Sequence, residues 1–150
     1  MQSTQVDAGF HTSRGIKEIN EDCAGLFIPK DEYLSNIKGA AFCVADGVSS
    51  AEAGKEASET AVERFLGEYF KTPDTWSVSR SGEQVLSAIN LRLFRKSHAF
   101  SQENKGYLST VSCLVLKGNH GHIFHVGDSR IYRFRDGNLK QLTADHTTNL

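Results

Sequence analysis

Asp46 closes a run of apolar residues that extends from Ala40 to Ala45, and Gly47 follows it directly. A short continuous run of this kind predicts a strand that is buried on both faces. A carboxylate at the end of a buried strand must be compensated if it is to stay ionised, and a metal ion is an efficient compensator. Gly47 allows a sharp turn that brings its own carbonyl close to whatever Asp46 holds. Taken alone, Asp-Gly is more often a strand terminator than a pair of ligands.

Two further acidic positions strengthen the metal hypothesis. Glu21 and Asp22 open the apolar run 23–28, and Asp128 follows Gly127 after another strand-like run. Side chains alternate along a strand, so Glu21 and Asp22 should point to opposite faces, one as a direct ligand and the other orienting a metal-bound water. A solvated strand entrance is the alternative for this pair. Acids of this kind at three strand ends are hard oxygen ligands that suit Mg²⁺ or Mn²⁺.

The composition is that of an ordinary globular chain, so we expect one domain over residues 1–150. The chain is 39% hydrophobic and 23% charged, and its net charge of -1 argues against nucleic-acid binding. It contains no apolar stretch long enough to cross a bilayer, and residues 1–5 lack a signal-peptide pattern, so we expect a cytoplasmic protein without a membrane partner. Cys23, Cys43 and Cys113 are widely spaced in apolar runs, which indicates reduced, buried thiols rather than zinc ligands.

Two amphipathic helices are expected in the middle of the chain. The first starts at a capping box formed by Ser49 and Glu52, and its apolar positions recur every four residues as far as Tyr69. The second starts at a capping box in 81–84 and ends near His98.

The segments outside these helices predict strands and connections. Residues 29–38 are expected to be a hairpin connection and 71–80 a loop, because both are polar and rich in turn residues. The histidines at 120, 122 and 125 do not converge on one side of a hairpin and therefore do not suit zinc. Apolar runs and alternation predict strands at 6–11, 22–28, 40–46, 111–116, 122–126, 131–134 and 139–142. Many antiparallel strands with two inserted helices indicate a layered α+β fold.

Five short motifs carry a family resemblance when they are read in order. The motifs are Asn20-Glu21-Asp22, Ala45-Asp46-Gly47, Ser109-Thr110, Gly127-Asp128-Ser129-Arg130 and residues 142–147. With them the chain resembles the metal-dependent serine/threonine protein phosphatases of type 2C, the PPM family, over nearly its whole length. The resemblance implies a β-sandwich of antiparallel sheets flanked by helices, with metal ions at one end between the sheets. It also implies hydrolysis of phosphoserine and phosphothreonine in proteins, in signal transduction.

The resemblance also implies a division of roles in the site. Glu21, Asp46 and the carbonyl of Gly47 would hold one divalent ion, Asp46 would bridge to a second, and Asp128 would contact an additional, weaker ion. Two cations about 4 Å apart, Mn²⁺ or Mg²⁺, would activate a bridging water as the nucleophile and neutralise the phosphoryl oxygens. No serine nucleophile is then required, and Ser129 is interpreted as structural because the sequence shows no partnered base.

The chain departs from the family pattern at three points. Lys17 stands where the family has a phosphate-binding arginine, so Lys17 and Arg14 are both candidates for holding the substrate phosphate, although a solvated loop cation fits equally well. Val48 stands where some members have a histidine that is a candidate general acid. The two aspartates that complete the family's second metal lie beyond 142–147, so we expect the N-terminal part of a phosphatase domain, incomplete at its C-terminus and inactive or very weak as an isolated chain.

Two classes of function therefore stay open. The favoured one is a protein serine/threonine phosphatase acting on phosphorylated proteins, and the other is a catalytically silent module that binds phosphoproteins or regulates a partner kinase. A sandwich that lacks part of its strands leaves unpaired edges and uncovered apolar surface. We therefore expect self-association or pairing with the missing part of the domain.

Overall fold

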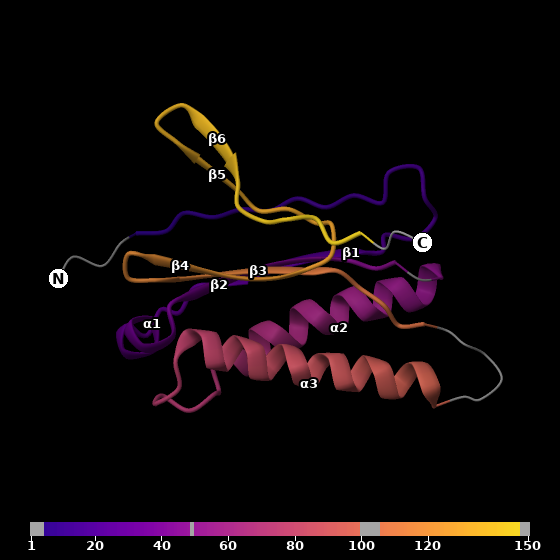
Figure 1. Cartoon of the computed structure of the whole chain (residues 1–150), viewed down its shortest axis with the longest axis horizontal. Coiled ribbons are helices and arrows are strands. Elements are labelled where there is room, and N and C mark those ends of the chain that lie inside the picture. The colour runs from indigo at the N-terminus through magenta and orange to yellow at the C-terminus, as the bar shows by residue number, and fades with distance from the viewer. Residues whose placement is uncertain (1–4, 49, 100–105, 148–150) are drawn as a thin grey trace.

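The computed structural model describes residues 5–48, 50–99 and 106–147 (Figure 1). Strands β1 to β4 form one antiparallel sheet in chain order, and β5 and β6 form a separate hairpin. This arrangement confirms the predicted α+β fold with antiparallel sheets. The elements are β1 (Asp22–Phe27), α1 (Glu32–Lys38), β2 (Ala40–Asp46), α2 (Ala51–Tyr69), α3 (Val78–His98), β3 (Val111–Lys117), β4 (His120–Val126), β5 (Tyr132–Arg135) and β6 (Asn138–Gln141). No helix within the described ranges is long and apolar enough to span a membrane.

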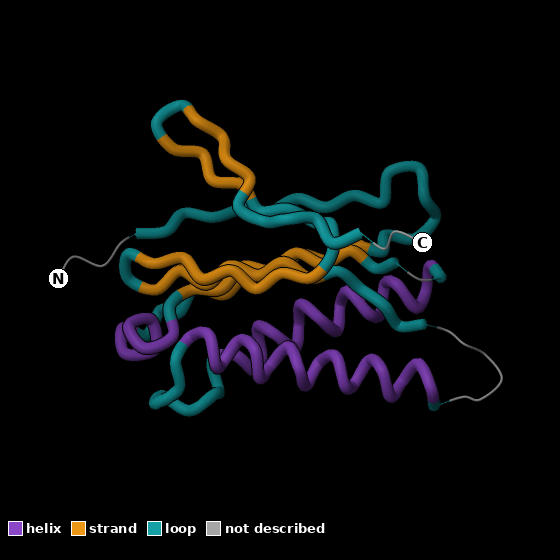
Figure 2. Tube along the Cα trace, viewed as in Figure 1, coloured by secondary structure: helices purple, strands orange, loops and turns teal. Residues whose placement is uncertain are grey.

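Helices α2 and α3 cover one face of the four-stranded sheet, as Figure 2 shows. Small residues in the strands let α2 approach closely: a Cβ added to Gly25 would lie 2.9 Å from the side chains of both Val62 and Leu66. The rings of Phe65 and Tyr69 stack with centroids 5.6 Å apart, and burial of a side chain such as Phe65 stabilises the fold by about 1.5–3 kcal/mol. The sheet contributes to this core through Ala41, Cys43, Ala45, Val111, Cys113, Val115 and Phe124.

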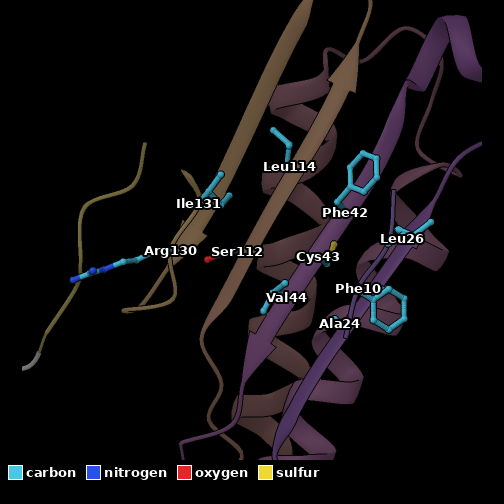
Figure 3. A pocket seen from close by; sticks show the side chains of 12 residues that line it. Phe10, Ala24, Leu26, Phe42, Cys43, Val44, Ser112, Leu114, Arg130 and Ile131 are labelled. Carbon is cyan, nitrogen blue, oxygen red and sulfur yellow. The ribbon is translucent and has the colours of Figure 1, made fainter. Parts of the chain in front are cut away.

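The opposite face of the same sheet is open. Val44 and Ile123 lie on it and are 49% and 36% exposed, although both occupy paired strand positions. Phe10 of the N-terminal segment and Ile131, which precedes β5, approach this face and border a hollow of about 250 Å³ (Figure 3). The face of the sheet that α2 and α3 cover is therefore part of a hydrophobic core, whereas the opposite face is an apolar surface that is only partly covered.

The prediction of a strand at 6–11 is wrong. These residues run beside the open face of the sheet without joining a ladder (Figure 1). Alternation of apolar and polar residues indicates that a segment lies along a half-buried surface. It does not indicate whether a strand edge is available for pairing. Phe10 is 60% exposed, so even the apolar side of this segment is only loosely packed.

The prediction of a hairpin connection at 29–38 is also wrong, because this segment contains helix α1. Asp31 caps the helix by accepting a hydrogen bond from the Tyr33 amide at 3.3 Å. Gly39 ends it with φ of 75°, a conformation that suits glycine. The capping residue and the terminating glycine are both visible in the sequence. The helix is only 7 residues long, however, which is too short for a clear apolar period.

Helix α3 begins earlier than predicted, so the loop expected at 71–80 ends at its cap, Ser77. The Ser77 hydroxyl accepts the Arg80 amide at 3.1 Å, whereas Ser81, the predicted cap, is buried in the helix and bonds Thr72 at 2.8 Å. The cap of α2 is Ser50, which makes no side-chain capping bond. The predicted capping residue Ser49 lies outside the described residues.

Lys38 ties the three helices together at the end of the molecule where α1 lies (Figure 1). The side chain is 2% exposed, and its Nζ donates to Thr72 Oγ1 at 2.6 Å and to the Pro73 carbonyl at 3.2 Å. The hydroxyl of Tyr69 donates to the Lys38 carbonyl at 2.8 Å. Burial lowers the pKa of Lys38, because the charged form loses hydration.

The contact between α3 and the sheet gives a direct test of the packing. A Cβ added to Gly82 would overlap the ring of Phe124, so Gly82→Ala should destabilise the fold by about 1–3 kcal/mol although alanine is the better helix former. Gly67 in α2 has open space around it, and Gly67→Ala should instead stabilise by about 0.5–1 kcal/mol. Urea unfolding of both variants measures this, and equal effects would contradict the packing.

Candidate metal and phosphate site

The ends of β1 and β2 bring two of the predicted acids into contact. Asp22 and Asp46 are partners in the β1–β2 ladder, and the Gly47 amide donates to the Glu21 carbonyl at 3.0 Å. Glu21 and Gly47 therefore form the hydrogen-bonded pair, which makes Asp22 and Asp46 the adjacent non-hydrogen-bonded pair with Cα atoms about 4.5 Å apart. Their side chains project from the same face, close enough for Asp22 to raise the pKa of Asp46.

The electrostatics of this pair are those of crowded acids. The pKa of Asp46 is raised to about 6, first by partial burial and then by its interactions with Asp22 and the Asp128 charge, while the charge of Lys17 lowers it. Asp128 follows β4 and Gly127, is exposed, and lies close enough for its charge to act on Asp46. The fold therefore brings together acids from three strand ends that are far apart in the sequence.

Glu21 lies on the other side of the strand pair, as the alternation of side chains predicts. A Cβ added to Gly54, in the first turn of α2, would lie 3.1 Å from Oε2 of Glu21. Gly47 in turn packs against the Gly54 carbonyl so closely that a side chain at 47 would overlap it. The backbone after Asp46 is thus held against the start of α2, and Glu21 borders this contact.

The donor set fits part of a divalent cation site. Within the described ranges, no three His, Cys, Asp or Glu side chains are arranged to bind a single ion. The Asp22–Asp46 contact is nevertheless one that a hard cation would stabilise, because two carboxylates repel each other unless a proton or a positive charge lies between them. The groups present are all oxygen donors, which Mg²⁺ and Mn²⁺ prefer.

The two candidate phosphate ligands differ in what they contact. The charge of Lys17 acts on Asp46, so Lys17 lies near the acids. Arg14 folds back on its own loop, and its Nη1 donates to the carbonyls of Lys17 at 3.5 Å and Glu18 at 3.4 Å. Arg14 therefore stabilises the loop, and Lys17 is the candidate whose charge acts on Asp46.

Two pairings were missed in the sequence because their members lie far apart in the chain. Arg130 grips both carboxylate oxygens of Asp145, with Nε–Oδ1 of 3.0 Å and Nη2–Oδ2 of 2.7 Å, which lowers the pKa of Asp145. The other pairing is between Thr110 and Ser129, whose hydroxyl oxygens are 2.9 Å apart. The Ser129 hydroxyl thus bonds another hydroxyl rather than a general base, as a structural role requires.

The histidine side chains in β4 do not form a cluster. His122 and His125 lie on opposite faces of the strand by its register. His125 bonds the Ser112 hydroxyl through Nδ1 at 2.8 Å and the Ala144 carbonyl through Nε2 at 3.1 Å. These contacts attach the segment after β6 to the sheet.

Comparison with known proteins decides the family. The profile described as "Protein phosphatase 2C" matches residues 28–150. The chain belongs to the protein phosphatase 2C family. A serine/threonine phosphatase stp from Listeria welshimeri is 32% identical over 147 residues, which cover 95% of this chain and 55% of the relative. The chain therefore spans about half the length of the curated relatives that it matches.

Solved phosphatases of this family share the fold. PppA of Pseudomonas aeruginosa superposes with a TM-score of 0.69 at 25% identity, over 91% of this chain and 54% of that one. The catalytic domain of the phosphatase PstP, solved in complex with 2 manganese ions, superposes with a TM-score of 0.71 at 24% identity, over 90% of this chain and 54% of that one.

The raised pKa of Asp46 gives a pH-dependent prediction for the metal-free chain. The folded state binds more protons than the unfolded state between the ordinary value of 3.8 and about 6, so stability should fall as the pH rises through this range. Asp46→Asn should therefore raise the melting temperature at about pH 8, where the repulsion is fully present, and have no such advantage below about pH 4. Asp7→Asn, at an exposed acid of the N-terminal segment, is the control. Thermal unfolding at both pH values measures the effect, and an equal shift at both would contradict it.

Proposed function

We propose that this chain supplies the N-terminal metal-binding part of a phosphatase that hydrolyses phosphoserine and phosphothreonine in proteins. The observation that carries the proposal is the contact between Asp22 and Asp46 at the ends of two paired strands, in a chain of the protein phosphatase 2C family. The manganese ions of the PstP catalytic domain support the same chemistry.

The residues of the chain have separate roles in this proposal. Asp46 would hold the divalent ions as the shared acid, together with Glu21, which borders the start of α2, and the Gly47 carbonyl. Asp22 would orient solvent on the opposite face, and Asp128 would hold an additional ion. When bound, Mn²⁺ or Mg²⁺ supplies an activated water and neutralises the charge of the phosphoryl oxygens. The remaining ligands would come from the part of the domain that lies outside the span shared with the longer relatives.

Lys17 and the open face of the sheet complete the proposal. Lys17 lies beside the acids and binds the substrate phosphate as a point charge, a role that Arg14 does not share because its guanidinium is turned toward its own loop. The apolar face that includes Val44 and Ile123 packs against the remaining portion of the catalytic domain, since exposed apolar surface of this extent on a paired sheet is costly. A second copy of the chain is the other occupant to consider.

Metal dependence tests the proposal directly. The full natural protein should hydrolyse p-nitrophenyl phosphate and a phosphothreonine peptide only with Mn²⁺ or Mg²⁺, and Asp46→Ala should lower kcat at least about 100-fold because it removes the shared ligand. Asp31→Ala, which removes a helix cap remote from the acids, is the control for a general loss of stability. Turnover that survives excess chelator would rule out the metal mechanism. Phosphopeptide binding without turnover at any metal concentration would support the catalytically silent alternative.

The role of Lys17 predicts a separation of kinetic constants. Lys17→Ala should raise KM about tenfold with a smaller effect on kcat, because it removes a contact to the bound phosphate, whereas Lys17→Arg should preserve or improve affinity through a bidentate contact. Arg14→Ala should act mainly on stability. Steady-state kinetics with the phosphothreonine peptide measures this. If neither Lys17 variant differs from the wild type, Lys17 is only a solvated loop cation.

A further inference from the structure

Thr110 lies opposite Asp46, where the regular ladder between β2 and β3 is interrupted. In a regular antiparallel ladder, the two residues of a hydrogen-bonded pair would exchange amide-to-carbonyl bonds. Here the Thr110 amide donates to the Asp46 carbonyl at 2.8 Å, but the Asp46 amide donates to the Thr110 side chain, at Oγ1, at 3.0 Å. The Thr110 carbonyl instead accepts the Ser109 hydroxyl at 2.7 Å. A side-chain oxygen has thus replaced the carbonyl at this position, and backbone pairing resumes beyond it between Gly47 and Ser109.

The same hydroxyl reaches the loop that carries Asp128. Thr110 Oγ1 lies 2.9 Å from the hydroxyl oxygen of Ser129, the residue after Asp128. The Thr110 side chain also packs against Gly127, which has φ of 113° and no room for a side chain. Thr110 is only 6% exposed, so this is a buried connection rather than a solvated one. The Thr110 side chain therefore contacts both the end of β2, which carries Asp46, and the loop that carries Asp128.

We propose that Thr110 is a positioning residue that holds Asp46 and the Asp128 loop in a fixed relation. The inference rests on the proposed metal-dependent function, and it adds a residue that neither binds metal nor touches substrate. Its physical basis is that the backbone bond from the Asp46 amide to β3 is missing, so this amide depends on the Thr110 hydroxyl as its acceptor. Without the hydroxyl, the Asp46 amide loses its acceptor and the Asp128 loop loses its link to the sheet.

Two substitutions separate the hydroxyl from the shape of the side chain. Thr110→Val keeps the volume but removes both hydrogen bonds, and Thr110→Ser keeps the hydroxyl but removes the methyl group. Thr143→Val is a matched control, because Thr143 is 8% exposed and its hydroxyl accepts the Ile131 amide at 3.2 Å. Loss of a partner that orients a metal ligand weakens metal binding by about 10–100-fold.

The test is a Mn²⁺ titration of the ¹⁵N-labelled chain, followed by paramagnetic broadening of the Asp46 and Gly47 amide signals. Hydrogen exchange of the Asp46 amide is measured separately without metal. Thr110→Val should speed exchange at Asp46 and raise the Mn²⁺ concentration for half-broadening about tenfold or more. Thr110→Ser and Thr143→Val should both stay close to the wild type in both measurements.

The outcomes distinguish this inference from the proposed function. If Mn²⁺ broadens the wild type and Thr110→Val alike, the positioning role is overturned while the metal site stands. If Mn²⁺ leaves the Asp46 and Gly47 signals of the wild type unchanged, the metal site is overturned and the inference falls with it. Should Thr110→Val fail to fold, Ser129→Ala takes its place, since it breaks only the link to the Asp128 loop. It should weaken Mn²⁺ binding without exposing the Asp46 amide, and unchanged binding would overturn the inference.

Discussion

Two carboxylates that face each other across paired strands determine the electrostatics of this end of the molecule. The ladder places Asp22 and Asp46 in a non-hydrogen-bonded pair, the closest side-chain approach in an antiparallel sheet, and Asp128 adds charge from a third strand end. Backbone pairing along the whole of β1 and β2 enforces this approach, so the acids cannot relax by moving apart. The fold thus holds carboxylates that repel each other close together, and a bound cation or a proton relieves this repulsion.

The rest of the structure supports that placement from both sides. On one side, Gly47 and Gly54 bring the backbone after Asp46 against the start of α2, which is itself fixed over the aromatic core around Phe65. On the other side, Thr110 ties the same backbone to the loop of Ser129. The acids sit where a rigid helix-covered sheet meets an open apolar face. A partner that covers the open face would also enclose the acids on that side.

Sequence reasoning located the acids and most of the elements because those signals are local. The run ending at Asp46, the helical period up to Tyr69 and the strands expected at 131–134 and 139–142 each depend on neighbouring residues. Helix α1 was missed because 7 residues give too short a period, although its cap at Asp31 was visible. The extended segment 6–11 was misassigned because strand alternation carries no information about which edge is free.

The contacts that determine the site could not be predicted in the same way. The Arg130–Asp145 pair spans 15 residues and the Thr110–Ser129 bond spans 19, and no spacing rule links such positions. The closeness of Asp22 to Asp46 requires the register of the ladder, which a shift of one residue would abolish. The family resemblance supplied the roles of the acids, but only the structure separated Lys17, beside the acids, from Arg14, turned toward its loop.

The burial of Lys38 has a practical consequence for anyone handling this protein. Its amine donates to two oxygens and the residue is only 2% exposed, whereas Lys30 and Lys71 are exposed. An acylating reagent should therefore modify Lys38 more slowly than these two lysines, at a rate set by how often its surroundings open. Mass spectrometry of the acylated chain would measure the opening of this end of the molecule.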